Sequence, residues 1–317
     1  MKNRLKYTKS LLFALGLLLF LATACTEDDE NSIFTPPAEE EVTDEIDLYV
    51  NEHMLKEHGT AVRWRWQAWF IDDDRQATPI KREFVIPTTD LVEYLWFEPY
   101  KVIGGGGEKL IKELFPPELV YIGSYIYKDD GTRLLGYAEG GARITLLNLN
   151  SYDLQNETWL TDPTRGGILA TVHHEFSHIV HQNYGIPAGF NTISEKYNGA
   201  GWSNGVTLSD AIKLGMVRNY GTANEYEDFC EIICHFLTLP ADVFQETFID
   251  QQSYDGITDV DEITEIRELN EGRLKIQQKL TLIEDFYKNR FNIDLVALRD
   301  TMANRINYVL TNNKIPE

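Results

Sequence analysis

The stretch from His174 to His178, which reads HEFSH, constrains this chain more than any other feature of its 317 residues. Two histidines four positions apart lie on one face of an α-helix, so both imidazoles can reach the same metal ion. Glu175 projects beside that ion, where it can hold and deprotonate a metal-bound water. The surrounding apolar segment predicts a helix from Ile168 to Tyr184. We therefore expect a zinc-binding helix; a structural helix with two hydrogen-bonded histidines is the alternative.

A catalytic zinc needs a third protein ligand and an open coordination position. In one class of such sites the third ligand is a histidine six residues after the second, but here that position holds Tyr184. A carboxylate on a second helix is the other choice, and the segment from Glu225 to Leu237 offers candidates. Glu227 and Glu231 share a helix face in this apolar segment, where acids need a cation or solvent. A solvated helix face is the alternative for this pair.

The other histidines and cysteines of the two helices receive weaker assignments. His173 points about 100° away from the first histidine of the motif, so we expect a core or surface residue. His181 lies one turn beyond the motif and could line the site, but we expect it to face water, while His235 could stand behind the site. Cys230 and Cys234 are four residues apart on one helix, a spacing that rarely permits a disulfide. We expect both to be buried thiols.

The first 24 residues predict a secretion signal, because Lys2, Arg4, Lys6 and Lys9 precede an apolar run too short to span a bilayer. The small residues before Cys25 resemble the lipobox of bacterial lipoproteins, which implies cleavage before Cys25 and its acylation. An ordinary secretory signal is the alternative. Residues 25–43 are acidic and polar and predict a tether. The start of that tether resembles the export tag of some Gram-negative lipoproteins that face the cell exterior.

Residues 44–317 are expected to form one domain of the α+β class, with a lobe at 44–165 and a helical lobe at 166–317. The first lobe mixes expected helices and strands: helices at 47–58 and 89–100, and strands at 61–71, 119–127 and 143–149. Helical periods dominate afterwards: 168–184, 225–237, 259–289 and 294–310. The third of these is either one long helix or two, broken near Gly272. We thus expect a small mixed sheet, the motif helix and a mostly helical C-terminal lobe.

Composition excludes several classes of function. A formal net charge of -21 disfavours binding to nucleic acid and, through a basic face, to anionic lipid. The membrane is therefore expected to be reached through the lipid anchor alone. The hydrophobic content of 43% argues against a disordered chain, and three cysteines are too few for a disulfide scaffold. The acidic run from Asp250 to Glu262 lacks the spacing of a calcium loop, so a solvated loop is expected.

The two helical segments resemble the gluzincin group of zinc peptidases, and in spacing the peptidase domain of anthrax toxin lethal factor. In that domain a Tyr-Gly pair precedes an acidic helix, as Tyr220 and the glycine after it precede the helix here. The resemblance implies that Glu227 is the third zinc ligand and that the phenol of Tyr220 stabilises the oxyanion. It also implies that Glu231 supports the ligands from behind. Asp228 and Cys230 depart from the residues of that domain, which affects local packing.

A resemblance over nearly the whole chain is to the substrate import-associated zinc metallohydrolase lipoproteins, also called putative zinc-binding metallopeptidases. The segments 137–141, 173–176, 214–217 and 292–295 carry it. The resemblance implies a zincin-like fold and a zinc hydrolase at the outer membrane, lipid-anchored and facing the cell exterior. Members are encoded beside outer-membrane importers of the TonB-dependent receptor and SusD-like lipoprotein type, which are the implied partners.

The resulting hypothesis is a zinc peptidase with one zinc ion per chain, bound by His174, His178 and Glu227. Glu175 would take a proton from the metal-bound water and pass it to the leaving amine. The substrate would be a peptide or protein, bound along an exposed sheet edge that we expect at 143–149. One alternative is a non-catalytic accessory lipoprotein of an importer, in which zinc only holds the fold. A second is hydrolysis of an ester or amide on a glycan.

Overall fold

The computed structural model describes residues 44–67, 71, 75–128, 133–134, 136–139 and 142–316. The predicted signal at 1–24, the tether at 25–43 and the lipidation residue Cys25 lie outside these residues. The chain from Thr43 onward belongs to one unit. Within the described part of the chain, no helix is long and apolar enough to cross a membrane.

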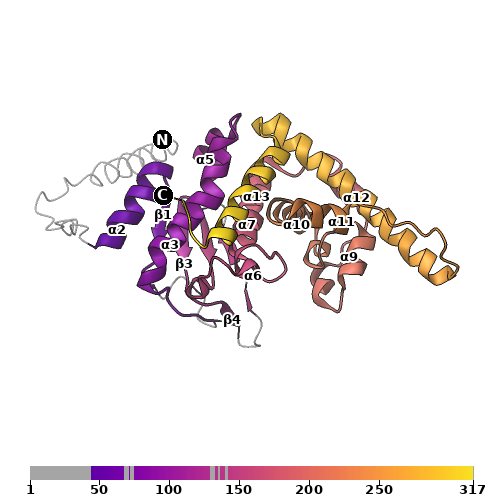
Figure 1. Cartoon of the computed structure of the whole chain (residues 1–317), viewed down its shortest axis with the longest axis horizontal. Coiled ribbons are helices and arrows are strands. Elements are labelled where there is room, and N and C mark those ends of the chain that lie inside the picture. The colour runs from indigo at the N-terminus through magenta and orange to yellow at the C-terminus, as the bar shows by residue number, and fades with distance from the viewer. Residues whose placement is uncertain are drawn as a thin grey trace, which may run out of the picture. The chain divides into compact units, whose positions relative to one another are not determined.

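A four-stranded mixed sheet forms the centre of the N-terminal half (Figure 1). Its order is β1 (Ala61–Arg63), β3 (Glu118–Tyr121), β7 (Arg143–Leu146) and β6 (Gly136–Glu139). The first three strands run parallel, and β6 pairs antiparallel with β7. Residues of β3 and β7 are buried nearly throughout, as expected for parallel strands with both faces covered. The sheet and the helices around it confirm the predicted α+β class.

The expectation that 143–149 forms an exposed sheet edge is wrong. The strand β7 lies between β3 and β6 and is hydrogen-bonded on both sides. The sheet ends instead at β6, which the sequence pattern did not predict because glycines flank this short strand. The predicted strand at 61–71 is also too long, since only 61–63 pair with β3. Trp64 leaves the sheet to bury its ring, and its indole N–H donates to the Asp47 carboxylate at 2.8 Å.

A second sheet consists of three short antiparallel strands, β2 (Arg75–Gln76), β4 (Ile126–Lys128) and β5 (Arg133–Leu134). The helices of this half are α2 (Glu45–Val50), α3 (Arg82–Val92), α4 (Glu98–Val102), α5 (Gly107–Leu114) and α6 (Glu157–Leu160). A π-helical segment, η1 (Asn51–Lys56), continues α2, and another, η3 (Glu93–Phe97), joins α3 to α4. The helix expected at 89–100 therefore begins earlier, because α3 includes Pro87, which a sequence pattern treats as a helix boundary.

The C-terminal half consists of helices: α7 (Ile168–Tyr184), α8 (Phe190–Ile193), α9 (Leu208–Leu214), α10 (Glu225–Thr238), α11 (Ala241–Phe248), α12 (Val260–Phe291) and α13 (Leu295–Asn312). The prediction for α7 is confirmed at both ends, and that for α10 to within one residue. The helix α12 is continuous through Gly272. At that glycine a β-carbon would lie 1.7 Å from the Ile212 carbonyl oxygen, so its absence lets α9 approach the backbone of α12.

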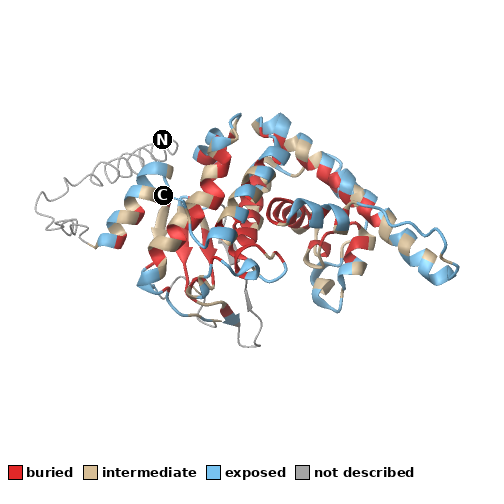
Figure 2. Ribbon diagram, viewed as in Figure 1, coloured by how far each residue is buried: buried red, intermediate tan, exposed pale blue. Residues whose placement is uncertain are grey.

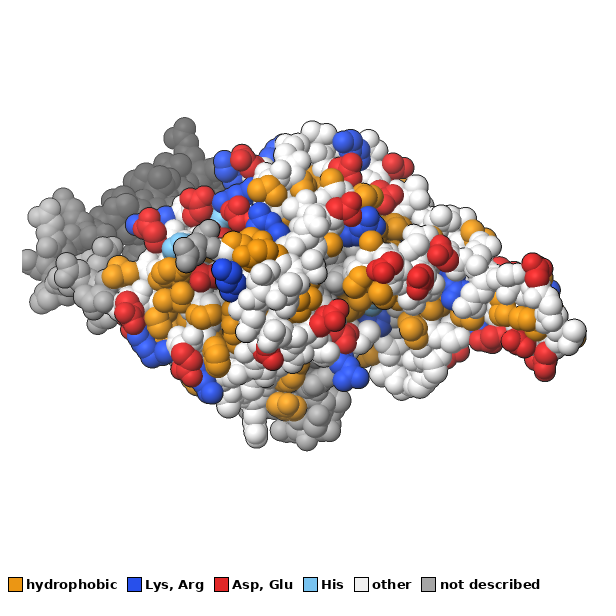
Figure 3. All heavy atoms as spheres, viewed as in Figure 1, with side chains coloured by type: hydrophobic (Ala, Val, Ile, Leu, Met, Phe, Trp, Pro, Cys, Tyr) orange, Lys and Arg blue, Asp and Glu red, His pale blue; other side chains and the backbone are white. Residues whose placement is uncertain are grey.

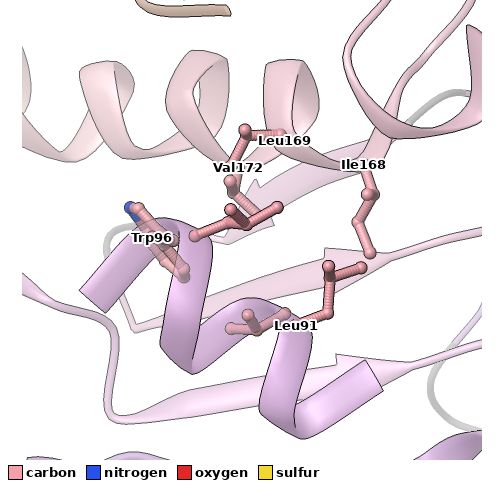
Figure 4. Close-up of a pocket in the computed structure, with 7 residues that line it drawn as sticks. Leu91, Trp96, Ile168, Leu169 and Val172 are labelled. Atoms are coloured by element: carbon pink, nitrogen blue, oxygen red, sulfur yellow. The ribbon is translucent and has the colours of Figure 1, made fainter. Parts of the chain in front are cut away.

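The main core joins the sheet, α7 and the helices of both halves (Figure 2). Aromatic rings form its centre, where Trp96, Phe115 and Phe176 contact one another. An apolar gap remains between the helical segment 91–96 and the first turns of α7, lined by Leu91, Trp96, Ile168, Leu169 and Val172 among others (Figure 4). This packing buries one face of α7 in the core, so the opposite face of the helix can carry side chains that do not pack there.

The surface of the C-terminal half is rich in acidic groups. Figure 3 shows them gathered around the end of the molecule where α12 begins. In this region the run from Asp250 to Glu262 is mostly exposed, and it brings no three ligand atoms close enough to hold a cation. The expectation of a solvated loop there is confirmed.

Candidate metal centre

His174 and His178 lie one turn apart on α7, and their imidazoles point to the same place. Their Nε2 atoms are 3.1 Å apart. The Glu227 carboxylate arrives from α10, with Oε2 at 3.2 Å from the Nε2 of His174 and 3.3 Å from that of His178. The three side chains are only 12–17% exposed. Two separate helices thus bring the three predicted ligands into one small triangle.

The start of α10 fixes where Glu227 points. The side chain of Asn224 caps the helix, accepting hydrogen bonds from the backbone N–H groups of Tyr226 and Glu227 at 2.9 and 3.0 Å. The cap places Glu227 in the first turn, where the helix dipole favours a negative charge. The helix α10 then packs along α7, which carries both histidines. The carboxylate is therefore held by local capping and by the contact between the two helices.

The triangle fits a tetrahedral metal ion. Zinc binds nitrogen and oxygen at about 2.0–2.1 Å in a tetrahedron, which places its ligand atoms roughly 3.3 Å apart. The three observed distances lie close to that value. The Oε2 atom of Glu227 is buried and has no hydrogen-bond donor of suitable geometry in the described part of the chain. Two imidazoles and a carboxylate are a donor set that zinc accepts readily, and three protein ligands leave a fourth position open.

The pKa values of the metal-free centre also indicate that it favours a positive charge. Burial lowers the pKa of His174, but its interactions with Cys234, Glu227 and Glu231 outweigh burial and raise the pKa well above its ordinary value. Burial raises the pKa of Glu227, yet the two histidines outweigh this effect and hold the pKa well below its usual range. A proton on His174 thus occupies the place that a cation would take.

Glu231 lies behind His174 and is 2% exposed. Its Oε1 is 3.4 Å from the Nδ1 of His174 and 3.3 Å from Arg218. Burial raises the pKa of Glu231, but Arg218 and His174 outweigh it and lower the pKa to about 2. Because His174 faces a carboxylate with one nitrogen, its other nitrogen is directed to the centre. His235, whose role the sequence left open, lies against Glu231, with its Nδ1 2.8 Å from the Glu231 carbonyl oxygen.

Tyr220 lies in a 3-10 turn just before α10, η6 (Tyr220–Thr222). Its ring stacks on the imidazole of His174, with the ring centres 5.8 Å apart. Burial, together with the charge of Glu227, raises the pKa of Tyr220 well above its usual value, so the hydroxyl keeps its proton and can donate it in a hydrogen bond. On α7, Glu175 is buried at 8% exposure, and its charge contributes to the raised pKa of Tyr220. Glu175 follows His174 on α7 and the Tyr220 ring stacks on His174, so the candidate base and the phenol both adjoin the same proposed ligand.

The structure places the remaining histidines and cysteines as follows. His173 is in the core, where neither ring nitrogen has a hydrogen-bond partner among the described residues and burial lowers its pKa to about 3. Cys230 and Cys234 are buried free thiols, as predicted. The expectation that His181 faces water is wrong: it is half-buried, and its Nε2 lies 2.9 Å from the Nδ1 of His178. The i, i+3 spacing places the two rings side by side on the helix, so the alternative position of His181, beside the site, is the one observed.

Three residues near the centre were missed at the level of sequence. Arg218 donates to the Pro163 carbonyl at 2.7 Å as well as pairing with Glu231, so it fastens the loop before α7 to the centre. Trp202 packs its ring edge-to-face with Tyr220 at 4.7 Å. Lys279 forms a fully buried ion pair with Asp228, the residue after Glu227. Of these three residues, only Lys279 has a signal in the sequence, because it is a charged residue within the apolar stripe of a helix.

Two further groups of ligand atoms lie close together beside the main one. They consist of His178, His181 and Cys230, and of His174, Glu231 and Cys234. Each shares a histidine with the triangle, and each includes a buried thiol whose pKa burial raises. The triangle is the better site, because its three ligand atoms lie 3.1–3.3 Å apart, close to the spacing of ligands around a tetrahedral zinc ion.

The chain matches known proteins of one kind. Residues 39–296 match the family described as "Putative zinc-binding metallo-peptidase". A crystal structure of a putative zinc-binding metallo-peptidase from Bacteroides caccae is similar in fold, with a TM-score of 0.65 and 26% sequence identity. The match covers 84% of this chain and 93% of that one. No curated protein sequence matches this chain.

Proposed function

This chain belongs to the putative zinc-binding metallo-peptidase family, and from that premise we propose that it hydrolyses peptide bonds with a zinc-activated water. The observation that carries the proposal is the triangle of His174, His178 and Glu227, whose ligand atoms lie 3.1–3.3 Å apart. One zinc ion per chain fits this donor set. The position opposite the triangle is left for solvent or substrate.

The chain's own residues supply the proton transfers. When bound, zinc acidifies a water molecule and polarises the carbonyl oxygen of the scissile bond. Glu175 follows the first ligand on α7 and is assigned as the general base that accepts the proton and later donates it to the leaving amine. The Tyr220 hydroxyl keeps its proton at neutral pH and is assigned to donate a hydrogen bond to the oxyanion. Glu231 and Arg218 keep His174 oriented.

A peptide is the substrate that the sheet favours. The strand β6 ends the mixed sheet, and it packs against α7. In the described part of the chain it pairs with β7 alone. An extended peptide can add to such an edge through backbone hydrogen bonds. This arrangement favours a peptide over an ester or amide on a glycan, for which no comparable support exists among the described residues.

The rival function is a non-catalytic accessory protein in which zinc only stabilises the fold. Such a site normally completes its coordination with a fourth protein ligand. Here the triangle consists of three protein ligands. Glu175, a buried carboxylate, and Tyr220, a protonated phenol, adjoin it. A structural zinc requires neither of these groups, so the centre favours the enzyme.

Replacing Glu175 by glutamine tests the proposal. We expect Glu175→Gln to bind zinc normally and to lose peptide hydrolysis by at least about 10²-fold, because general base catalysis is removed while the ligands remain. Zinc content and cleavage of a peptide library should be measured together, with and without chelator. Gln182→Ala, an exposed change on the same helix, serves as the control and should be fully active. Unchanged hydrolysis in Glu175→Gln would falsify the assigned mechanism, and cleavage of glycan esters alone would move the enzyme to another substrate class.

We also propose that the protein is a lipoprotein of the outer membrane, held by Cys25 and facing the cell exterior. Support comes from the signal-like first 24 residues, the small residues before Cys25 and the acidic stretch after it. Cys25→Ser should release the protein from the membrane fraction, because an unacylated chain keeps no anchor. Membrane retention of Cys25→Ser would contradict the anchor. An association with a TonB-dependent receptor and a SusD-like lipoprotein remains a proposal from family resemblance, to be tested by co-purification from membranes.

A further inference from the structure

The two histidines of the triangle are supported in different ways. His174 turns its Nδ1 toward the carboxylate of Glu231 at 3.4 Å. His178 turns its Nδ1 toward another imidazole, since the Nε2 of His181 lies 2.9 Å away. Histidines that bind metals usually donate the N–H of their second nitrogen to such a partner, which sets the tautomer and the direction of the ring. His178 therefore has a candidate hydrogen-bond partner in His181.

His181 is itself held in place by α10. Its ring stacks on that of Tyr226, with the centres 4.8 Å apart and the planes at 23°. The edge of Phe229 contacts it from the same helix, at 6.2 Å between ring centres. Tyr226 immediately precedes Glu227, so the helix that delivers the carboxylate also clamps the imidazole. His181 thus links the positions of the α7 and α10 ligands.

We propose that His181 is a positioning residue that accepts a hydrogen bond from the Nδ1–H of His178 and so directs the Nε2 lone pair of His178 to the metal. The inference rests on the proposed zinc site of His174, His178 and Glu227.

A second cation between His178, His181 and Cys230 is the competing interpretation of this cluster. A cation held there together with the proposed zinc would need both nitrogens of His178, because its Nε2 faces the triangle and its Nδ1 faces His181. A neutral imidazole carries a proton on one nitrogen and has only one lone pair to offer. The 2.9 Å between the two imidazole nitrogens is an ordinary hydrogen-bond distance. The geometry therefore favours a hydrogen bond.

Three variants test the role of His181 through zinc affinity. His181→Phe keeps a ring against Tyr226 but removes the acceptor, and we expect it to weaken zinc binding about 10- to 100-fold. His181→Gln places an amide oxygen near the position of Nε2, and we expect it to recover most of that loss. Gln182→Ala should bind zinc like the unsubstituted protein. Affinity is measured by competition with a chromogenic chelator, and metal-free melting temperatures show whether each variant folds. The proposal is overturned if His181→Phe binds zinc normally or if His181→Gln binds no better than His181→Phe.

A measurement on the unsubstituted protein keeps the inference testable even if a variant fails to fold. Long-range ¹H–¹⁵N NMR spectra of the zinc-loaded chain report which nitrogen of each histidine carries a proton. We expect His181 to be protonated on Nδ1 alone, with Nε2 showing the shift of a hydrogen-bond acceptor. A proton on Nε2 of His181 would overturn the inference. Neither readout involves catalysis, so the inference can fail while peptide hydrolysis stands, and loss of hydrolysis in Glu175→Gln leaves it untouched.

Discussion

At the scale of residues, His174 is where we expect a proton to be exchanged for the proposed metal ion. The carboxylates of Glu227 and Glu231 lie at 3.2 and 3.4 Å from its two nitrogens. The Nε2 atom of His174 faces the other two proposed ligands. Zinc can bind to this nitrogen only when it carries no proton. In the metal-free protein the pKa of His174 is raised well above its ordinary value. The proton accordingly stabilises the metal-free fold at low pH, and this contribution is lost as the pH rises through the raised pKa.

Zinc affinity should therefore rise with pH. For each displaced proton the dissociation constant falls up to about tenfold per pH unit over the pH range below the raised pKa of His174. Titration calorimetry in buffers with different ionisation enthalpies counts the protons released on zinc binding. A dissociation constant that does not vary over this range, with no proton released, would contradict the exchange.

The residues of the triangle could be predicted because helical spacing is a local property. An i, i+4 pair shares a face whatever the rest of the chain does, so the sequence indicated His174 and His178. The apolar helix with two acids left Glu227 and Glu231 open, and the family resemblance implied Glu227. Arg218 and Trp202 could not be found this way. Each reaches the centre from a loop whose path depends on the packing of α7 against α10.

At the scale of elements, α12 shows where helix propensity gives the wrong answer. Gly272 lowers the intrinsic stability of a helix interior, so a break was considered there. The helix continues because the missing β-carbon lets the α9 backbone approach, with the Ile212 carbonyl oxygen 1.7 Å and the Lys213 Cα 2.9 Å from where that carbon would lie. At Gly272 the contact between α9 and α12 therefore outweighs the low helix propensity of glycine.

Gly272→Ala should therefore destabilise the protein. Propensity alone predicts a gain of about 1 kcal/mol, whereas forcing α9 away from α12 should cost more and leave a net loss of about 1–3 kcal/mol. Denaturant unfolding of the metal-free chain measures the free energy directly. Glu271→Ala, an exposed change one residue earlier, is the control and should be neutral or slightly stabilising. A Gly272→Ala protein as stable as that control would show that α9 yields without cost.

Strands were predicted less well than helices, for a physical reason. The long helices carry an apolar period of their own, and α7 has the bounds that this period predicted. The strands β1 and β6 are short, and their limits are set by pairing with β3 and β7 rather than by their own composition. Aromatic residues after Arg63 favoured a longer strand, but Trp64 obtains its burial and its hydrogen bond from α2 instead.

At the scale of the whole molecule, the order of the chain determines where the centre lies. The mixed sheet and its helices come first, α7 carries the two histidines across the core, and α10 returns against it with the carboxylate. The α+β class followed from the change of pattern near residue 165, since strand-like and helical periods occupy different halves. The order of strands within the sheet could not be predicted, because it depends on contacts distant in sequence.

The centre should couple metal binding to the stability of the entire domain. Zinc held by His174, His178 and Glu227 bridges α7 and α10, and the unfolded chain cannot present the three atoms together. At a free zinc concentration about 100 times the dissociation constant, binding adds about 2.7 kcal/mol to the free energy of unfolding. For a domain of this size that corresponds to a rise of roughly 5–10 °C in melting temperature. The double variant His178→Ala/Glu227→Ala keeps one of the three ligands, so zinc should not raise its melting temperature. Magnesium should raise the melting temperature of neither protein. If zinc stabilised the double variant as much as the unsubstituted chain, the ion would have to bind elsewhere, and the helices would owe their arrangement to packing alone.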